Sequence, residues 1–413
     1  MEVKDGYKQM ELGIIPDDWD ERTLLSISSK ITDGDHLTPK REAEGNYLLS
    51  ARNIRDSYID LTDVDYVGDE EYTRMRQRCA PEVGDILMSC SGHGLGRAST
   101  VPQGLRCVLV RSAALIKLNP RKADGLFIQY CLQAPYVQRQ IFSGKSLAAQ
   151  PNLFINSIER LRCLLPASVS EQRAIATALS DADALIESLQ ELIGKKCRLK
   201  QGAMQELLGR RDGWATKRLG NTAVLKARIG WQGLTTAEYL DAGDFYLVTG
   251  TDFANGYIDW THCAYVAESR YRQDKNIQLR ENDVLVTKDG TIGKVAFVDH
   301  LDKPATLNSG VFVIRPIEGA FNAEFFYYLL CSKVFAEFLG QLSAGSTINH
   351  LYQKDFVNFI YKMPTTLAEQ SAIARILRDM DTEIAALKAK LSKARHLKQG
   401  MMQELLTGRT RLV

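Results

Sequence analysis

Residues 165–208 and 363–406 repeat one another without a gap, and 21 of these 44 aligned positions are identical. Each copy opens with a proline, Pro166 or Pro364, continues through Glu-Gln and Ala-Ile-Ala, and closes with Gln-Glu-Leu-Leu. Chance does not produce agreement of this length at a constant offset of 198 residues. The chain therefore contains one structural element twice, and the remaining residues have to fold around that duplication.

The repeated element has the residue pattern of a long helix. Apolar residues recur at alternating steps of four and three, which places them on one face. The pattern is sustained for about four heptads, which favours two long helices packed on each other over two amphipathic helices buried separately in their own domains. A helix of this length rises about 60 Å and would act as a spacer. The positions on this face are Ile175, Leu179, Ala182, Ile186, Leu189, Ile193, Lys196, Lys200, Ala203 and Leu207 in the first copy, and Ile373, Leu377, Met380, Ile384, Leu387, Leu391, Ala394, Lys398, Met401 and Leu405 in the second.

The chain outside the repeat forms two segments of similar size that are weakly alike. "YIDLTDVDYV" (58–67) matches "YIDWTHCAYV" (257–266), and "GDILMSCSGHGLGRA" (84–98) resembles "NDVLVTKDGTIGKVA" (282–296). Alternating apolar runs, a helix rich in aromatic residues and a polar loop follow in each segment. We therefore expect an α+β fold in which two homologous domains alternate with two long antiparallel helices, with pseudo-two-fold symmetry. The expected segments are 1–164 and 212–362 for the domains, and 165–211 and 363–413 for the helices.

The composition indicates a cytoplasmic protein without membrane association. The stretch "MEVKDGYKQMELG" has no apolar core of the kind a secretion signal needs, and no later run approaches twenty apolar residues. The eight cysteines lack the two-residue spacing of a zinc or redox motif, so we expect reduced and mostly buried thiols. With 52 basic and 50 acidic residues the net charge is only +2, so a polyanionic partner requires the basic groups to be gathered on one face.

Two different domains separated by a matched pair of helices suit a rod-shaped ligand. Double-stranded DNA is such a rod, with half-sites on one face recurring about every 34 Å, and protein symmetry follows the symmetry of the site. Because the two domains differ in sequence, we expect the two half-sites to differ as well.

Several short motifs make this expectation more specific. They are "GIIPDDW" (13–19), "KITDGDHLTP" (30–39), "GDIL" (84–87) followed by a glycine loop, "KARIGWQGLTT" (226–236), and the paired Pro…Glu-Gln…Ala-Ile-Ala helices that end in "QELL". Each motif is weak alone, but their order and constant offset resemble the specificity subunit of Type I restriction-modification systems. The resemblance covers nearly the whole chain.

The resemblance implies a DNA-reading subunit without catalytic activity. Two target recognition domains would each bind one part of a split sequence, and the helices would measure the unspecified spacer. The implied partners are double-stranded DNA, two modification subunits that methylate adenine, and restriction subunits that translocate and cleave DNA. No cofactor is implied for this chain, because S-adenosylmethionine, ATP and Mg²⁺ would be bound by those subunits. The alternatives are a related split-target system without the translocating subunit, a scaffold that reads no sequence, and an independent nuclease or methyltransferase.

Catalytic motifs are missing from the sequence, in agreement with a DNA-recognition subunit that has no catalytic activity. No Pro-Pro pair occurs, as the base-binding loop of an adenine methyltransferase would require, and "TKDGTIGK" has Lys288 where a phosphate-binding loop needs glycine. The cluster "SGHGLG" (91–96) favours a tight turn beside DNA, with a purely structural turn as the alternative. His36 and His93 have no repeated partner at the spacing of metal ligands.

Three polar loops in each domain contain the expected DNA contacts. In chain order they are Asp33–Lys40, Ser91–Arg97 and Lys145–Asn152 in the first domain, and Lys226–Thr235, Lys288–Lys294 and Ser346–His350 in the second. Phosphate contacts supply affinity and base-edge contacts supply specificity, and Arg, Lys, Asn and Gln side chains suit both. For any single residue a solvated side chain is an equal alternative. The candidates are His36, Thr38, Lys40, Ser91, His93, Arg97, Lys145, Ser146, Gln150 and Asn152 in the first domain, and Lys226, Arg228, Trp231, Gln232, Lys288, Thr291, Lys294, Ser346, Thr347, Asn349 and His350 in the second.

The matching helix ends predict one docking surface presented twice to partner subunits. The basic run "KKCRLK" (195–200) would face spacer phosphates, a partner or solvent. A solvated or partner-facing surface, rather than a metal site, is expected for Asp181 and Asp183 and for their repeats Asp379 and Asp381. The candidates for partner binding are Gln201, Met204 and Leu208 in the first helix, and Gln399, Met402 and Leu406 in the second.

Overall fold

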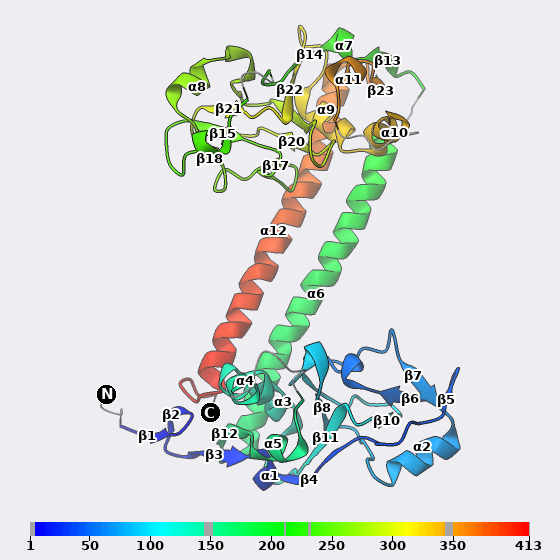
Figure 1. The fold of residues 1–413 in the computed structure, drawn as a ribbon, viewed down its shortest axis with the longest axis vertical. Helices are drawn as coiled ribbons and strands as arrows, with labels where there is room; N and C mark the ends of the chain where they lie inside the picture. Colours follow the sequence, from blue (N-terminus) through cyan, green and yellow to red (C-terminus); the bar gives the residue numbers. More distant parts are fainter. Residues whose placement is uncertain (1–4, 144–151, 210–211, 230–232, 343–349, 413) are drawn as a thin grey trace. The chain divides into compact units, whose positions relative to one another are not determined.

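The computed structural model describes residues 5–143, 152–209, 212–229, 233–342 and 350–412 (Figure 1). It divides into two compact units, Met1–Gln190 with Lys390–Val413, and Glu191–Ala389. Two long helices, α6 (Val169–Leu208) and α12 (Leu367–Leu405), belong partly to each unit. Each unit therefore contains the start of one long helix and the end of the other. Within the described residues, no helix is long and apolar enough to cross a membrane.

The first unit is built on a mixed set of sheets packed against short helices. One sheet has the strand order β4-β11-β8-β9 and another has the order β10-β6-β7-β5, while β12 pairs with β3 and β1 with β2. Apolar side chains of α3 and α4 share one core with β8 and β11. The strands are β1 (Tyr7–Met10), β2 (Gly13–Pro16), β3 (Trp19–Thr23), β4 (Ser28–Asp33), β5 (Arg41–Glu42), β6 (Asn46–Leu49), β7 (Asp65–Val67), β8 (Ile86–Ser89), β9 (Ala98–Thr100), β10 (Cys107–Leu109), β11 (Ala113–Leu118) and β12 (Arg162–Pro166), and the helices are α1 (Leu24–Ile27), α2 (Asp69–Arg76), α3 (Gly125–Gln133), α4 (Pro135–Phe142) and α5 (Ile155–Arg160).

The second unit repeats this arrangement and extends it. Its largest sheet has the order β14-β22-β19-β20-β17-β16, a second has the order β18-β15-β21, and β13 pairs with β23. The strands are β13 (Ala215–Arg218), β14 (Ala223–Lys226), β15 (Tyr246–Val248), β16 (Phe253–Ala254), β17 (Tyr257–Ile258), β18 (Ala264–Tyr265), β19 (Val284–Thr287), β20 (Val295–Phe297), β21 (Ala305–Leu307), β22 (Val311–Pro316) and β23 (Ile360–Met363), and the helices are α7 (Leu219–Thr222), α8 (Glu268–Arg272), α9 (Ala323–Leu330), α10 (Lys333–Leu342) and α11 (Gln353–Phe356).

The central strand order is the same in both units. The series β4-β11-β8-β9 of the first unit corresponds to β14-β22-β19-β20 of the second, and all of these neighbours pair antiparallel. The parallel pair β10-β6 likewise corresponds to β21-β15. The predicted α+β class is confirmed. A coiled coil along the whole length of the two helices stays a prediction.

The helix ends that meet in the first unit run antiparallel. Ile175 and Leu179 near the start of α6 lie in the same buried cluster as Leu405 at the end of α12. Further along α6, Asp183 forms an ion pair with Lys398, which precedes Leu405 in α12. Residue numbers thus rise along one helix while they fall along its partner.

The second unit shows the same antiparallel meeting with the helix roles exchanged. Ile373 and Leu377 near the start of α12 share a buried cluster with Leu208 at the end of α6. Asp381 of α12 then pairs with Lys200 of α6. Each unit therefore buries one helix start against the end of the other helix.

A buried glutamine joins the start of α6 to the first unit. Gln172 is fully buried, and its Oε1 accepts a hydrogen bond of 2.8 Å from the backbone N–H of Asp124, the N-cap of α3. Its Nε2 donates to the carbonyls of Pro166 (3.1 Å) and Lys122 (3.2 Å). One side chain therefore satisfies three backbone groups where strand, helix and loop meet.

The same connection recurs at the start of α12. The backbone N–H of Asn322, the N-cap of α9, donates to Oε1 of the buried Gln370 at 2.8 Å. Nε2 of Gln370 donates to the carbonyl of Pro364 at 2.9 Å. The repeated Glu-Gln of the sequence thus marks the attachment of each long helix to its own domain.

The end of the chain closes the first unit through ion pairs. Both terminal nitrogens of Arg411 lie 2.9 Å from the carboxylate of Asp18, and Nη2 also lies 2.8 Å from Glu171. The carboxylate of Glu171 is almost fully buried, so its charge depends on this partner. In the second unit the corresponding Glu369 instead accepts a hydrogen bond from the indole N–H of Trp214 at 3.4 Å.

Replacing Gln172 by alanine should destabilise the first unit. The change removes the partner of three backbone groups, of which the carbonyl of Pro166 is in a buried hydrogen bond, and an unsatisfied buried group costs about 1–3 kcal/mol. We expect the melting temperature, followed by circular dichroism, to fall by several degrees. Gln190→Ala, on an exposed position of the same helix, is the control and should melt like the wild type. Equal melting of the two variants would contradict the role given to Gln172.

Candidate functional site

Three loops of the first unit converge at one end of its central sheet. We name them the first loop (Ser50–Asn53, after β6), the glycine loop (Ser89–Arg97, between β8 and β9) and the return loop (Val110–Ala113, between β10 and β11). The backbone N–H of Cys90 donates to the carbonyl of Ser112 at 2.8 Å and so joins the glycine loop to the return loop.

The second unit has the same three loops in the same order. They are the first loop (Thr249–Asp252, after β15), the glycine loop (Thr287–Lys294, between β19 and β20) and the return loop (Asn308–Val311, between β21 and β22). Here the backbone N–H of Lys288 donates to the carbonyl of Gly310 at 2.9 Å. The hydrogen bond between the loops is therefore conserved within the chain while the side chains differ.

The glycine loops are tight turns that depend on left-handed backbone. Gly92 and Gly96 have φ of 74° and 82°, and Gly290 and Gly293 have φ of 67° and 80°. Residues other than glycine rarely adopt these backbone angles. The N–H of Gly96 donates to the carbonyl of Ser89 at 2.9 Å, and the N–H of Gly293 donates equivalently in the second unit at 2.9 Å. The tight turn predicted for residues 91–96 is present, the second unit has an equivalent turn, and its position beside DNA stays a prediction.

The segment after the third predicted loop also joins the glycine loop. In the first unit the N–H of Leu153 donates to the carbonyl of Cys90 at 2.9 Å, and Asn152 forms an isolated bridge with Ser91. In the second unit the N–H of Leu351 donates to the carbonyl of Lys288 at 2.8 Å.

A contact between side chains adds to this junction in the second unit. The imidazole of His350, which precedes Leu351, forms a hydrogen bond with the carboxylate of Asp289 in the glycine loop. The structure thus brings Ser91 together with Asn152, and Asp289 together with His350.

A buried polar side chain shapes each first loop. In the second unit Asp252 is buried, and its Oδ2 accepts from both the N–H (2.7 Å) and the hydroxyl (2.9 Å) of Thr249. Burial raises the pKa of Asp252, against the opposing effect of these hydrogen bonds. In the first unit Asn53 takes the same place, with its Oδ1 3.0 Å from the N–H of Ser50.

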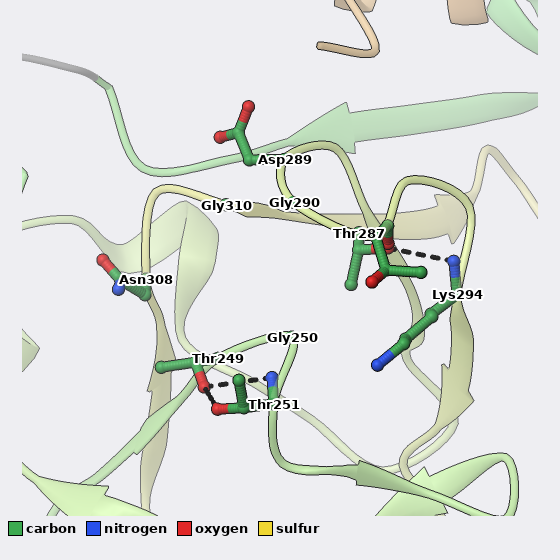
Figure 2. Close-up of a pocket in the computed structure, with 10 residues that line it drawn as sticks. Thr249, Gly250, Thr251, Thr287, Asp289, Gly290, Lys294, Asn308 and Gly310 are labelled. Carbon is green, nitrogen blue, oxygen red and sulfur yellow. Dashed lines mark hydrogen bonds between the residues drawn. The ribbon is translucent and has the colours of Figure 1, made fainter. Parts of the chain in front are cut away.

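The loops of the second unit line a cleft of about 240 Å³ (Figure 2). Threonine and glycine residues form most of its lining. The N–H of Lys294 donates to the hydroxyl of the buried Thr287 at 2.9 Å, and the hydroxyls of Thr249 and Thr251 lie 2.7 Å apart. The lining residues are Thr249, Gly250, Thr251, Thr287, Asp289, Gly290, Thr291, Lys294, Asn308 and Gly310.

Lys294 supplies positive charge to this cleft. Its side chain is exposed and extends toward the side where Thr249 and Thr251 lie, whereas the carboxylate of Asp289 points away (Figure 2). Among the described residues no ion pair neutralises Lys294. A single ammonium beside hydroxyl groups suits an anionic oxygen such as that of a phosphate. The matching position in the first unit is Arg97, which is half-buried.

Sequence reasoning missed the first loops and the return loops. Thr249, Thr251 and Asn308 line the cleft, yet they lie outside the three predicted loops of their domain. A signal was present, because "YLLSARN" (47–53) aligns with "YLVTGTD" (246–252) after an apolar strand in each domain. Arg111 of the first return loop is exposed and was also missed.

The predicted loop Asp33–Lys40 lies against the return loop of the first unit. The N–H of Asp35 donates to the carbonyl of Leu109 at 2.8 Å. His36, Thr38 and Lys40 are all exposed on this segment.

His36 is held in place by a neighbouring carboxylate. Its Nε2 lies 2.6 Å from Asp33, which also binds Arg78 at 2.6 Å. Burial opposes ionisation of Asp33, but the bonds from Arg78 and His36 outweigh it and lower the pKa of Asp33. Within the described residues, no cluster of His, Cys, Asp and Glu side chains has the geometry of a metal site.

Arg228 must be removed from the candidate DNA contacts. Its side chain is 1% exposed, and its Nε donates to the carbonyl of Leu307 at 2.9 Å while Nη2 donates to Thr306 at 3.2 Å. Burial, and then the positive charge of Arg270, lower the pKa of Arg228. The guanidinium therefore stabilises the interior of the second unit and is not available to a ligand.

The other predicted DNA contacts differ in their exposure and in whether the structure describes them. Lys226 and Thr291 are exposed, whereas the ammonium of Lys288 lies 5.6 Å from the ring centroid of the buried Phe312. The side chain of His93 lies outside the described structure, as do all atoms of Lys145, Ser146, Gln150, Trp231, Gln232, Ser346, Thr347 and Asn349.

The predicted docking residues divide between core and surface. Leu208 and Leu406 are buried in the cores of their units, 2% and 0% exposed, so their assignment as partner contacts is corrected to structural support. Gln201 and Gln399 are exposed, and Met204 and Met402 are half-buried.

A groove of about 630 Å³ in the second unit contains the first of these predicted sets. It runs between the end of α6, with Gln201 and Met204, and the start of α10, with Val334 and Glu337. At the matching positions of the first unit stand Tyr136, which is buried, and Arg139.

Comparison with known proteins gives one consistent family. A model described as the Type I restriction modification DNA specificity domain matches residues 212–395. The putative type I restriction enzyme MjaX specificity subunit of Methanocaldococcus jannaschii is 26% identical, over 99% of this chain and 97% of its own length. The type I restriction enzyme MjaVIII specificity subunit of the same organism is 23% identical over the same shares.

Solved structures share the fold. The S subunit of a Type I restriction-modification system from M. genitalium has a TM-score of 0.62 at 16% identity and covers 98% of both chains. A chain from a study of complex assembly and conformational transition of the type I R-M system has a TM-score of 0.57 at 16% identity, over 96% of this chain and 99% of its own.

Residues 212–395 thus match a DNA specificity domain, and the whole chain is similar to DNA-specificity proteins. More narrowly, the relatives that the chain resembles over nearly its whole length are specificity subunits of Type I restriction-modification systems.

Lys294→Ala should weaken DNA binding by the assembled complex without changing its sequence preference. Loss of one phosphate contact lowers the slope of log affinity against log salt by about 0.9, and we expect about threefold to tenfold weaker binding at low salt. Fluorescence anisotropy over a salt series measures both quantities. Lys217→Ala, at an exposed lysine of β13 outside the cleft, should match the wild type. An unchanged slope would remove Lys294 from the interface.

Proposed function

We propose that the chain reads a split DNA target, with the three loops of each unit contacting one half-site. The observation that carries this proposal is the repetition of one backbone frame with different side chains. Where the first glycine loop has Ser91 and Arg97, the second has Asp289 and Lys294. Two frames of one shape with different side chains are suited to reading two different sequences at equivalent positions.

The chemistry of the loops supports contact with DNA in particular. Arg97, Arg111 and Lys294 form no ion pair among the described residues, so their charge remains for phosphate or base oxygens. Hydroxyl and amide groups at the cleft supply donors and acceptors of the kind that base edges match. The net charge of the whole chain is close to zero, yet the loops contain cations without an ion-pair partner among the described residues. The composition alone does not reveal them.

We further propose that the two helix ends dock two modification subunits, and through them restriction subunits. The groove beside Met204 and Val334 supports this role for the second unit, because apolar and polar residues line it together. S-adenosylmethionine, ATP and Mg²⁺ would then be bound by the partner subunits, in the cytoplasm where the DNA is. The long helices would set the length of the unspecified spacer between the half-sites.

Mapping of methylated adenines across the host genome tests the main proposal. With this chain present, methylation should occur at one sequence made of two short parts separated by a spacer of constant length, and deletion of the chain should abolish it. Exchange of residues 1–164 for the corresponding domain of another specificity subunit should change one part and keep the other. Methylation at a single uninterrupted sequence would contradict a split target.

Insertion of one heptad into each long helix tests the role of the helices. Insertion after Gln190 in α6 and after Ala389 in α12, where the two units divide, adds about 10 Å of helix, or the length of about three base pairs. We expect a longer spacer in the methylated sequence with both half-sites unchanged. A change in the half-sites with an unchanged spacer would exclude the helices as the measuring element.

A further inference from the structure

A lysine, an aspartate and a tyrosine meet in the second unit at the junction of both long helices with the domain. Nζ of Lys200 in α6 lies 2.5 Å from Oδ1 of Asp381 in α12, and the hydroxyl of Tyr328 in α9 donates to Oδ2 of the same aspartate at 2.9 Å. The ammonium of Lys200 also lies 5.5 Å from the ring centroid of Tyr328. The three side chains form a closed set of contacts, which we call a triad.

The first unit contains the same triad from residues 198 positions away. Nζ of Lys398 in α12 lies 2.6 Å from Oδ1 of Asp183 in α6, and the hydroxyl of Tyr130 in α3 donates to Oδ2 at 2.8 Å. The ammonium of Lys398 lies 5.4 Å from the ring centroid of Tyr130. Both triads therefore use one residue from each long helix and one from the domain.

The triads are mostly enclosed by protein. The lysine side chains are 20% and 17% exposed, and Tyr328 and Tyr130 are buried. Burial, assisted by the neighbouring aspartate, raises the pKa of each tyrosine, so the phenol stays protonated and donates its hydrogen bond. The aspartates, expected on a solvated or partner-facing surface, are thus occupied within the protein.

Lys200 and Lys398 stand on the mostly apolar face of each helix, which in the first helix also contains Lys196. A polar residue at such a position lowers stability but selects one register of two helices, because other registers leave it without a partner. A shift by one heptad would set Asp183 against Leu391 or Leu405. It would also set Lys200 against Ala374 or against another lysine.

We propose that the two triads are positioning groups for DNA reading, which hold each target recognition domain to the helix pair in one register and thereby decide which spacer length is accepted. The inference rests on the proposed function, because it assigns a role in reading a split target. In each triad the aspartate of one long helix binds both the tyrosine of the domain and the lysine of the other long helix. Each triad therefore holds three elements together.

The test compares spacer lengths for the complete complex with its modification subunits. The probes are DNA duplexes that carry the two half-sites found by adenine mapping, with the natural spacer or with one base pair more or fewer. The variant Lys200→Met with Lys398→Met keeps an unbranched apolar side chain at each position and removes both positive charges. We expect its preference for the natural spacer, measured from methylation rates, to fall about tenfold while the preference for both half-sites is kept.

Three variants make the result specific. Lys200→Arg with Lys398→Arg keeps the charges and should retain most of the preference. Tyr130→Phe with Tyr328→Phe removes only two hydroxyls and should lower it about threefold, which keeps the test valid if the methionine variant does not assemble. Lys196→Met is the matched control, since Lys196 pairs with Glu383 at 2.6 Å but is replaced by Ala394 in the repeat.

The outcomes separate the two proposals. If the wild type shows no split target, the proposed function is wrong. If the wild type reads a split target and the phenylalanine and methionine variants, folded and assembled, keep its spacer preference, the role of the triads is wrong. Equal loss in Lys196→Met would also overturn the assignment to the triads.

Discussion

The attachment of each long helix to its domain by one buried glutamine is the interaction on which the other features depend. Gln172 and Gln370 each connect a helix start with the N-cap of the aromatic helix that follows the central sheet. A glutamine can do this because its amide both accepts and donates. With the helix start fixed, the aspartate about three turns later has a defined place, and so has the lysine of the opposing helix.

The duplicated loops show how one frame holds different chemistry. The bonds that join the glycine loop to the return loop run between backbone groups, so they do not depend on which side chains the loop contains. Within the glycine loop, a particular residue, glycine, is required where the backbone turns sharply, as at Gly92 and Gly290. The remaining positions of the loops are free to differ, and they do: Cys90 stands where the other unit has Lys288.

The repeat and its heptad pattern predicted the two helices well, since both signals are local in sequence. The predicted segment 165–211 contains the observed helix Val169–Leu208, and the α+β class followed from the paired strand motifs. The glycine turns were predictable for the same reason. Burial of Arg228 was not, because its partner Leu307 lies 79 positions away and no local pattern marks the pair.

The role of Asp183 was missed for a related reason. Its partner Lys398 belongs to the other helix, and Tyr130 belongs to the domain, so the helix pattern alone shows only an isolated acid. The constant offset of 198 residues could have indicated the tyrosine of each triad. Extension of the alignment upstream of the helices pairs Tyr130 with Tyr328, which are both buried at equivalent places.

The second unit is formed from one continuous stretch of chain, whereas the first is formed from two, Met1–Gln190 and Lys390–Val413. During synthesis the first unit therefore lacks Leu405, Leu406 and Arg411 until the residues of the second unit have been made. Its apolar surface at Ile175 and Leu179 stays uncovered while the whole second unit folds. The domain that is made first is thus the one that is completed last.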